Sequence, residues 1–357
     1  DSDGTLAAYR LHIDQDAGAH PGIGAFLPVF GQMMATGSYD IPKLEFSAES
    51  WVTTTVPMGA YRGAGRPEAT HGIERIMDRY AVEIGMDPAE LRRRNFIDPE
   101  VFPFTTPSGQ VYDSGAYADA LDAVLDALGI EDLRADQDRR RGDDECSLLG
   151  IGFAAYVEIA NPTRAPEFGS VTIRPDGSAV VLTGSSAHGQ SHHTTFAQVA
   201  ADVLGIDFDL IEVRHGDTDE VVRGGGTGGS RSLQTGGVAV HRASEAVVED
   251  AKRVVAGLLE ASADDVVLDV DSGVFSVAGS PTVHVGWVDV AAEAARIGEQ
   301  LAEEVDFQPS EATFPFGVHA SVVEVDRETG QVSILRHVAC DDAGIIVNPM
   351  IVDGQVH

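Results

Sequence analysis

The chain has 357 residues, 43% of them hydrophobic, and its 57 acidic and 24 basic side chains give a formal net charge of −33. That charge repels phosphate backbones and argues against a nucleic-acid partner, and no apolar run approaches the ~20 residues that span a bilayer. The only two cysteines, Cys146 and Cys340, cannot build a disulfide framework or a four-thiolate metal site. We therefore expect a cytoplasmic protein without a membrane span, with a solvated acidic surface and two or three domains.

Apolar patterns divide the first part of the chain into alternating strand-like and helical stretches. Asp87 followed by Pro88 is a capping sequence for a short helix, and we expect its three arginines, residues 92–94, near the surface. The elements predicted here are strands at residues 6–13 and 51–55 and helices at residues 67–84, 88–94 and 117–128.

Residues 132–145 are rich in charge and poor in apolar side chains, which predicts an exposed segment and a domain boundary. We therefore predict a first domain at 1–135, a linker at 136–145 and a second domain at 146–357. Strands and helices do not alternate strictly, as is typical of an α+β fold of mixed sheets with packed helices. The later elements are strands at 151–159, 169–173, 179–183 and 210–214, helices at 194–204, 236–263 and 288–297, and hairpins at 266–277 and 318–338.

Three polar stretches, far apart in the chain, are studded with glycine. Glycine lets a backbone approach a ligand closely, while successive N–H groups and arginine forks suit phosphate or oxyanion oxygens. Together the stretches predict the walls of one anionic-cofactor site. They are Ala60-Tyr61-Arg62-Gly63-Ala64-Gly65-Arg66, His188-Gly189-Gln190-Ser191, and Gly224-Gly225-Gly226-Thr227-Gly228-Gly229-Ser230-Arg231-Ser232.

Each stretch also has an ordinary structural interpretation. Arg62 and Arg66 suit an oxyanion cradle, and a helix-entry turn with two exposed arginines explains them nearly as well. The Gln190 amide suits the edge of a heterocycle or a hydrogen bond within its own turn. No carboxylate or thiolate stands at zinc spacing from the histidines near His188, so we expect no protein zinc site.

Other chemistries lack their sequence signatures. Residues 224–232 have no phosphate-loop lysine, and neither a G-x-G-x-x-G unit with a downstream ribose acid nor a G-x-S-x-G nucleophile elbow is evident. Asp341 and Asp342 suit paired acid/base carboxylates, although a solvated pair at a strand end is the simpler interpretation. Nucleotide hydrolysis and serine hydrolysis are therefore disfavoured.

Further segments accompany the glycine stretches, and all of them occur in an order known from one family. They are Ile84-Gly85-Met86-Asp87-Pro88-Ala89-Glu90-Leu91-Arg92, Asn348-Pro349 and Gly354-Gln355-Val356-His357. Over nearly its whole length the chain resembles the large, molybdenum-binding subunit of the xanthine dehydrogenase and aldehyde oxidase family. Within that family it is most similar to the subgroup of carbon monoxide dehydrogenase large subunits.

The resemblance implies a multi-domain molybdopterin-binding architecture, in which a pterin, often a cytosine dinucleotide in bacterial members, holds molybdenum. The metal would have no direct protein ligand. The positions implied around it are Arg62, Gly63 and Gly229; those implied at the pterin and its nucleotide are Gly189, Gln190, Ser230, Arg231 and Ser232, with Asn348 and Gln355 as weaker candidates.

The resemblance also implies a reaction and partners. The family reaction is oxidative hydroxylation of an aldehyde or N-heterocycle with water as the oxygen source, and electrons leave through 2Fe–2S centres to FAD. We therefore expect a small 2Fe–2S subunit, a medium FAD-binding subunit and a higher oligomer. Because the family's general-base glutamate would lie beyond His357 and its Phe-Gly-Gly loop before Asp1, we expect an incomplete subunit from a longer protein.

Two positions depart from the family pattern. Carbon monoxide dehydrogenases that resemble this chain place a copper-binding cysteine where Gly63 stands, which argues against carbon monoxide oxidation. Ser191 replaces the last glycine of a Gly-Gln-Gly motif, a change that narrows close backbone approach. The alternatives to a hydroxylase are a carbon monoxide dehydrogenase-like subunit and a non-catalytic module that binds an anion or metabolite.

Overall fold

The computed structural model describes residues 3–142 and 146–357 and separates into two compact units, each considered by itself. Unit 1 comprises Asp1–Ile159 and Thr313–Gly344, and unit 2 comprises Ala160–Ala312 and Ile345–His357. Residues 143–145 of the predicted linker lie outside the described residues. The two units are defined by contacts in space, and unit 1 extends past residue 135. The predicted domains, divided by a linker at 136–145, were defined by composition and stay a prediction.

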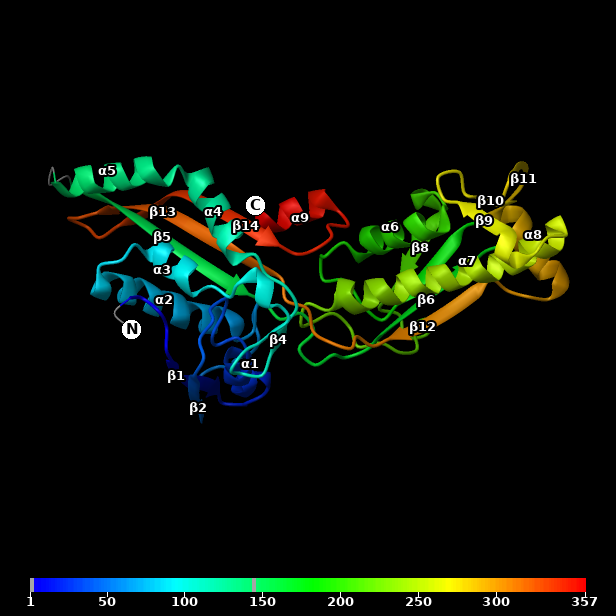
Figure 1. The fold of residues 1–357 in the computed structure, drawn as a ribbon. Helices are drawn as coiled ribbons and strands as arrows, with labels where there is room; N and C mark the ends of the chain where they lie inside the picture. The colour runs from blue at the N-terminus through cyan, green and yellow to red at the C-terminus, as the bar shows by residue number, and fades with distance from the viewer. Residues whose placement is uncertain (1–2, 143–145) are drawn as a thin grey trace. The chain divides into compact units, whose positions relative to one another are not determined.

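Unit 1 is organised around a three-stranded antiparallel sheet. Its elements are β1 (Tyr9–Gly18), η1 (Ile23–Phe26), α1 (Leu27–Met33), β2 (Leu44–Val52), α2 (Arg66–Ile84), α3 (Pro88–Asn95), η2 (Pro99–Val101), β3 (Phe104–Thr105), β4 (Val111–Tyr112), α4 (Tyr117–Leu128), α5 (Ile130–Gly142), β5 (Ser147–Val157), β13 (Phe316–Asp326) and β14 (Val332–Asp342). The sheet order is β14-β13-β5; α4 packs on β13 and β14, and α2 and α5 pack on β5 (Figure 1). A parallel pair, β1-β2, and a short antiparallel pair, β3-β4, complete the unit.

Unit 2 is a sheet with two helices packed along it. Its elements are β6 (Glu167–Ile173), β7 (Ala179–Thr183), α6 (His192–Leu204), η3 (Phe208–Leu210), β8 (Ile211–Arg214), the π-helical turn η4 (Ser232–Gly237), α7 (Val238–Leu259), η5 (Ala263–Asp265), β9 (Val266–Asp269), β10 (Val274–Val277), β11 (Ser280–Gly286), α8 (Trp287–Ile297), β12 (Ala302–Phe307) and α9 (Pro349–Val356). The main sheet has the order β12-β6-β7-β8, and β9, β10 and β11 form a second sheet. Helix α7 packs along β6 and β12, and α6 packs on β8 and α7 (Figure 1).

The core of unit 2 explains why these elements form where they do. Alternate strand residues such as Val171 and Val181 are fully buried, and helix residues at i, i+3 and i+4 spacing, such as Phe196 and Val247, cover them. Two strand-to-helix connections, from β7 to α6 and from β8 to α7, begin at one end of this layered core. The first connection contains the glycine stretch at 188–191, and the second contains the glycine stretch at 224–232.

Several predicted helices are confirmed together with their end signals. Helix α2 ends at Gly85, which is left-handed, and Asp87 accepts hydrogen bonds from the N–H groups of Ala89 and Glu90 at 2.8 and 3.2 Å. Helix α4 has the predicted bounds and ends at Gly129, also left-handed. The α+β class and both hairpins, β9-β10 and β13-β14, are confirmed as well.

Other elements differ from prediction. Helix α5 includes residues 132–142 of the segment predicted only as exposed, and Gln137 is its buried residue. Ion pairs from Asp136 to Arg139 and Arg140, three and four positions away, support this helix without an apolar stripe. Strands β1 and β2 are longer or shifted relative to 6–13 and 51–55, and α7 starts late because η4 precedes it. Sequence patterns missed α1, β11, β12 and α9 altogether.

The expectation that all three arginines of α3 lie near the surface is wrong for Arg92. Its side chain is fully buried, and its guanidinium donates to Glu74 at 2.8 Å, to Asp78 at 2.9 Å and to the carbonyl of Phe153 in β5 at 3.1 Å. Burial raises the pKa of the Glu74 carboxyl, and the Arg92 charge opposes that rise. Arg92 thus connects α2, α3 and β5, because its fork reaches three partners at once.

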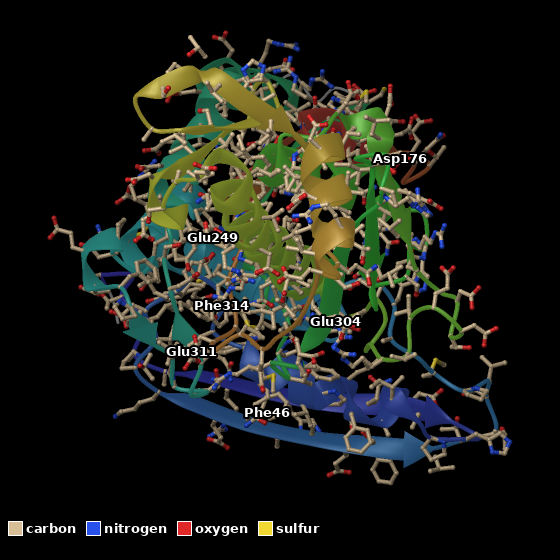
Figure 2. All side chains as sticks on the ribbon, turned by 90° about the vertical axis from the view of Figure 1, so that its right-hand side faces the viewer. Phe46, Asp176, Glu249, Glu304, Glu311 and Phe314 are labelled. Atoms are coloured by element: carbon tan, nitrogen blue, oxygen red, sulfur yellow. The ribbon has the colours of Figure 1, made fainter. Side chains whose placement is uncertain are left out.

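The acidic excess lies at the surface. Figure 2 labels Glu249 and Glu304 among the side chains of unit 2, and these two are 66% and 61% exposed. None of the helices in residues 3–142 and 146–357 combines the length and the apolar character of a transmembrane segment.

Replacing Arg92 by leucine should destabilise unit 1 strongly, since it leaves the buried Glu74 carboxylate without its counter-charge. We expect a loss of about 3–5 kcal/mol in the free energy of unfolding, measured by denaturant titration. Arg93→Leu is the matched control, because Arg93 pairs with Glu90 and Asp122 at the surface and should change stability by about 1 kcal/mol or less. Equal effects of the two substitutions would contradict this role for Arg92.

Candidate functional site

The first glycine stretch is the tight turn that leads into α2 in unit 1. Gly63, Ala64 and Gly65 have φ values of 98°, 42° and 87°, and the Arg66 N–H closes the turn on the Gly63 carbonyl at 3.2 Å. Arg62 is exposed, as is Tyr61, at 88%. The turn therefore presents the Arg62 side chain to solvent.

Arg66 does not share that exposure. It is 6% exposed, and its guanidinium pairs with Glu158, just after β5, through Nε at 3.1 and 3.2 Å and a terminal nitrogen at 2.6 Å. Another terminal nitrogen donates to the Ala64 carbonyl at 3.0 Å. Of the two arginines predicted to be free at this turn, Arg66 instead holds the turn from inside.

Gly63 occupies a position that tolerates no side chain without rearrangement. A Cβ atom built there would lie 2.5 Å from Cγ of Pro67, and φ of 98° is unfavourable for any residue with a Cβ. The glycine is thus required by the turn itself, whatever ligand the turn meets.

The second glycine stretch joins β7 to α6 in unit 2. Gly189 has φ 97°, and the space where its Cβ would lie is open for 4 Å. The Gln190 side-chain oxygen accepts a hydrogen bond from the His188 N–H. This is the hydrogen bond within its own turn that the structural interpretation of Gln190 predicts. Ser191 is left-handed, with φ 62°, and its carbonyl accepts from Thr194 and Thr195 at the first turn of α6.

The third glycine stretch joins β8 to η4 and α7. Gly228, Gly229 and Ser230 are exposed; Gly229 and Ser230 are left-handed, and the Gly229 carbonyl accepts from the N–H of Asn161 at 2.7 Å. Ser232 shares a hydrogen bond with Thr227 at 3.1 Å. Successive N–H groups in such a turn form a concave donor surface of the kind that receives anions.

Arg231 points away from that surface. It is 8% exposed; its guanidinium donates to Glu167 at 3.0 Å and to the Gly226 carbonyl at 2.9 and 3.1 Å. The structure therefore places the Arg231 guanidinium beneath the loop, between Glu167 and the Gly226 carbonyl.

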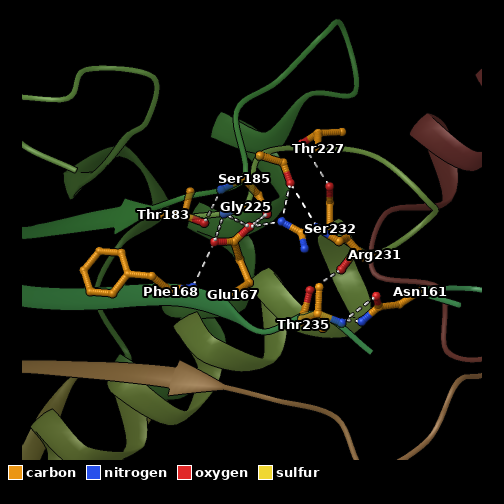
Figure 3. Close-up of polar contacts among 12 residues, drawn as sticks. Asn161, Glu167, Phe168, Thr183, Ser185, Gly225, Thr227, Arg231, Ser232 and Thr235 are labelled. Atoms are coloured by element: carbon orange, nitrogen blue, oxygen red, sulfur yellow. Dashed lines mark hydrogen bonds and ion pairs between the residues drawn. The ribbon is translucent and has the colours of Figure 1, made fainter. Parts of the chain in front are cut away.

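Glu167, the first residue of β6, joins the third stretch to Ser185, at the start of the connection that contains the second stretch (Figure 3). Its carboxylate is 1% exposed and accepts hydrogen bonds from the Gly225 N–H at 3.2 Å, from the Ser185 hydroxyl at 3.3 Å and from Arg231. A Cβ on Gly184 would lie 2.2 Å from this carboxylate and 2.4 Å from Cα of Gly224. The two loops therefore touch through their backbones.

Histidines lie beneath the second stretch. His192 is buried and its Nδ1 lies 3.0 Å from the Ser185 carbonyl, which can only accept, so Nδ1 carries the proton. Burial lowers the pKa of His192 and of His215, which favours their neutral forms. In the part of the chain that the structure describes, no group of three or more His, Cys, Asp or Glu side chains is arranged to hold a metal ion.

The remaining candidates lie at α9. Asn348 caps this helix by accepting from the Ile351 N–H at 3.0 Å, and its amide donates to Gln198 of α6 at 3.0 Å. Gln355 is exposed on α9. Asn348 thus connects α9 to the helix that begins at the second glycine stretch.

Within unit 2 the third stretch lies against Gly184 and Ser185, at the start of the connection that contains the second stretch, while Arg62 and Gly63 form a turn in unit 1. Sequence patterns missed the residues that hold these loops, namely Glu158, Glu167, Ser185 and Asn161. Their partners are distant in the chain, so no local spacing indicates them. The one available signal was a charged residue, Glu167, at the start of a strand that is otherwise buried.

Two family models match the chain. Both are described as a molybdopterin cofactor-binding domain, one over residues 1–96 and the other over residues 123–357. The mixed α+β units and their glycine loops at helix entries are accordingly those of a molybdopterin-binding protein. The chain belongs to the family of molybdenum-binding large subunits that includes xanthine dehydrogenase and aldehyde oxidase.

Its similarity to individual members can be stated more closely. It is 37% identical to the carbon monoxide dehydrogenase large chain of Hydrogenophaga pseudoflava and 33% identical to the nicotine 6-hydroxylase large subunit of Paenarthrobacter nicotinovorans, in both cases over 99% of this chain and 46% of the relative. The quinoline 2-oxidoreductase of Pseudomonas putida 86 superposes on all of the chain, and on 48% of its own, with a TM-score of 0.91 at 31% identity. The chain spans about half the length of these relatives.

The residues present fit the cofactor of the family. Helices α6 and α7 follow glycine loops, and exposed backbone at Gly189 and at Gly228–Ser230 offers N–H donors with room beside them. The buried arginine beneath the third loop is already paired, so the loop offers donors without an additional bare charge. Such a surface suits a pterin with a phosphate-bearing tail.

Gly63→Ala should destabilise unit 1, because alanine would have to adopt φ near 98° against Pro67. We expect a loss of about 1–3 kcal/mol in the free energy of unfolding, from denaturant titration. Gly59→Ala is the matched control in the same loop; it has open space and no positive φ, so a change below about 1 kcal/mol is expected. The requirement for glycine would be refuted by a neutral Gly63→Ala.

Ser191→Gly should stabilise unit 2 slightly, by up to about 1 kcal/mol, because glycine relieves the left-handed strain at the start of α6. Ser186→Gly in the same connection is the control. Ser186 is not left-handed, so added chain flexibility should lower stability there by about 0.5–1 kcal/mol. Opposite signs in thermal unfolding are the expected result, and a loss of stability in both variants would count against strain at Ser191.

Proposed function

We propose that the chain is part of the large subunit of a molybdenum hydroxylase, which oxidatively hydroxylates an aldehyde or an N-heterocycle. In this reaction a substrate C–H becomes C–OH with oxygen from water; the C–H bond gives up two electrons and one proton, and the water gives up the second proton. Family membership and the open glycine loops at the entries of α6 and α7 support the proposal. The observation that carries it is the pair of loops joined at Glu167, within a chain of this family.

The proposed cofactor contacts follow the exposed backbone. Gly189 and Gln190 would meet the pterin, and the 228–232 segment would meet its phosphate-bearing tail through backbone N–H groups and the hydroxyls of Ser230 and Ser232. Arg231 would support that segment from below. The bound molybdenum cofactor would supply the two-electron oxidation.

Four further residues have supporting parts in the proposal. Arg62 and Gly63 of unit 1 would face the metal end of the cofactor, where the exposed guanidinium of Arg62 would stabilise negative charge. Asn348, with Gln355 nearby on α9, would line the pocket, and its hydrogen bond to Gln198 fixes the start of that helix.

The finer identity of the cofactor and the partners belongs to the same proposal. We propose the cytosine dinucleotide form of molybdopterin, a medium subunit with FAD, a small subunit with 2Fe–2S centres, and assembly of these into a higher oligomer in the cytoplasm. Two relatives support partner subunits, because their names describe a large subunit and the gamma subunit of a complex.

A carbon monoxide dehydrogenase is the second candidate, and one observation favours it. Two carbon monoxide dehydrogenase large chains share 37% and 35% of their aligned residues with this chain. The turn at Gly63 speaks against it, because a cysteine there would collide with Pro67 and would need positive φ. We therefore favour hydroxylation of a carbon compound without copper.

Cofactor extraction from the native complex tests the proposal. We expect stoichiometric molybdenum by elemental analysis, a fluorescent oxidised pterin, cytidine monophosphate after hydrolysis of the nucleotide, and no copper. Assays with a dye acceptor in water enriched in oxygen-18 should place the label in the product of an aldehyde or N-heterocycle. Stoichiometric copper with carbon monoxide oxidation would favour the second candidate, and a complex free of pterin would leave a non-catalytic binding module.

A further inference from the structure

The glycine turns of the two units share one arrangement of buried side chains. In each, an arginine stands at the end of the glycine run, pairs with a glutamate at a strand end, and reaches back to a carbonyl of its own loop. Arg66 pairs with Glu158 and bonds the Ala64 carbonyl at 3.0 Å. Arg231 pairs with Glu167 and bonds the Gly226 carbonyl at 2.9 Å. Only a guanidinium, with five donors in a planar fork, can hold a carboxylate and a loop carbonyl together in this way.

Both arginines are occupied and enclosed. They are 6% and 8% exposed, and the Arg231 guanidinium packs so closely under Gly225 that a Cβ there would lie 1.8 Å from its terminal nitrogen. The backbone of Gly228, Gly229 and Ser230 is exposed by contrast. An anion that approaches the third loop would therefore meet backbone N–H groups before it could meet Arg231.

The ion pair between Glu167 and Arg231 also determines the net charge under the third loop. Glu167 lies directly beneath Gly225, whose N–H it accepts at 3.2 Å, and its bare carboxylate would repel any phosphate group received by the loop. Arg231 neutralises it at 3.0 Å. Shape and charge of the loop thus depend on the same contact.

We infer that Glu167 and Arg231 are positioning residues, which retain the anionic tail of the cofactor by shaping and neutralising the loop at 224–232 without touching the cofactor. This inference rests on the proposed function, because it takes the phosphate-bearing tail as the ligand of the third loop. It assigns to Arg231 a part other than direct pyrophosphate binding.

The test measures how fast the native complex releases its cofactor. Pterin release is followed by fluorescence after oxidation, at a fixed temperature below unfolding, for the wild type and for Arg231→Met, Arg231→Lys and the double variant Glu167→Gln/Arg231→Met. We expect Arg231→Met to release pterin roughly tenfold faster or more, since it leaves Glu167 charged beneath the loop. Arg231→Lys should fall between this variant and the wild type, because it keeps the charge and loses the fork.

The double variant separates charge from packing. It leaves no buried charge beneath the third loop, so its release rate should return toward that of the wild type although the ion pair is absent. Trp287→Phe is the matched structural control: it removes the hydrogen bond from the Trp287 ring to the Leu204 carbonyl at 2.7 Å, at the far end of α6 from the loops. It should lower the thermal midpoint and leave the release rate unchanged.

The outcomes distinguish this inference from the proposed function. A wild-type complex without pterin refutes the proposed function before any variant is compared. A wild type that holds pterin, with Arg231 variants that release it at the wild-type rate, refutes the inference alone. If Trp287→Phe accelerates pterin release equally, or if the double variant releases pterin as fast as Arg231→Met, the Glu167–Arg231 pair only stabilises the fold. Either result would overturn the assigned charge effect. If Arg231→Met does not fold, Arg231→Lys and the double variant still decide.

Discussion

Burial of guanidinium–carboxylate pairs is the constraint on which the rest of this structure depends. Removing either ion from water is unfavourable by several kcal/mol, roughly, and only close, multiply hydrogen-bonded geometry offsets that loss. The chain meets the condition at Arg92 with Glu74, at Arg66 with Glu158 and at Arg231 with Glu167. The first pair connects helices to a strand, and the other two hold the glycine turns.

The glycine turns need that support because they contain conformations that a free chain would seldom adopt. Ala64, Ser191 and Ser230 are left-handed without being glycine, and such strain persists only where the surroundings over-determine the backbone. Arg66 and Arg231 supply part of this constraint through loop carbonyls, and Asn161 supplies more through Gly229. Rigid turns with exposed N–H groups are what an anionic ligand requires, since the donors need no reorganisation on binding.

A chain with net charge −33 that belongs to a family binding a phosphorylated pterin raises an electrostatic question. The surface charges and the backbone donors act over different distances. Surface carboxylates are screened beyond about 8 Å at physiological ionic strength, whereas backbone donors act at contact. Glu167, the carboxylate directly under the third loop, is neutralised by Arg231. Local dipoles therefore outweigh the overall charge at the loops.

Local patterns in the sequence were sufficient for elements whose causes are local. The Asp87 cap, the left-handed glycines that end α2 and α4, and the alternating strands β7 and β13 all depend on neighbours within a few residues, and these predictions are confirmed. Helix α5 escaped because ion pairs rather than an apolar stripe support it. The glycine stretches were found from composition, and the family from their order.

What the sequence by itself determined is therefore the class of fold, most helices and the identity of the family. Tertiary structure alone decided which charged side chains face inward. Arg62 and Arg66 look equivalent in the sequence, as do Arg92 and Arg93, yet one of each pair is buried against a carboxylate 92 or 18 positions away. The physical reason is that burial of a charge depends on a partner that folding brings close. The number of residues between the two partners does not indicate their distance in space.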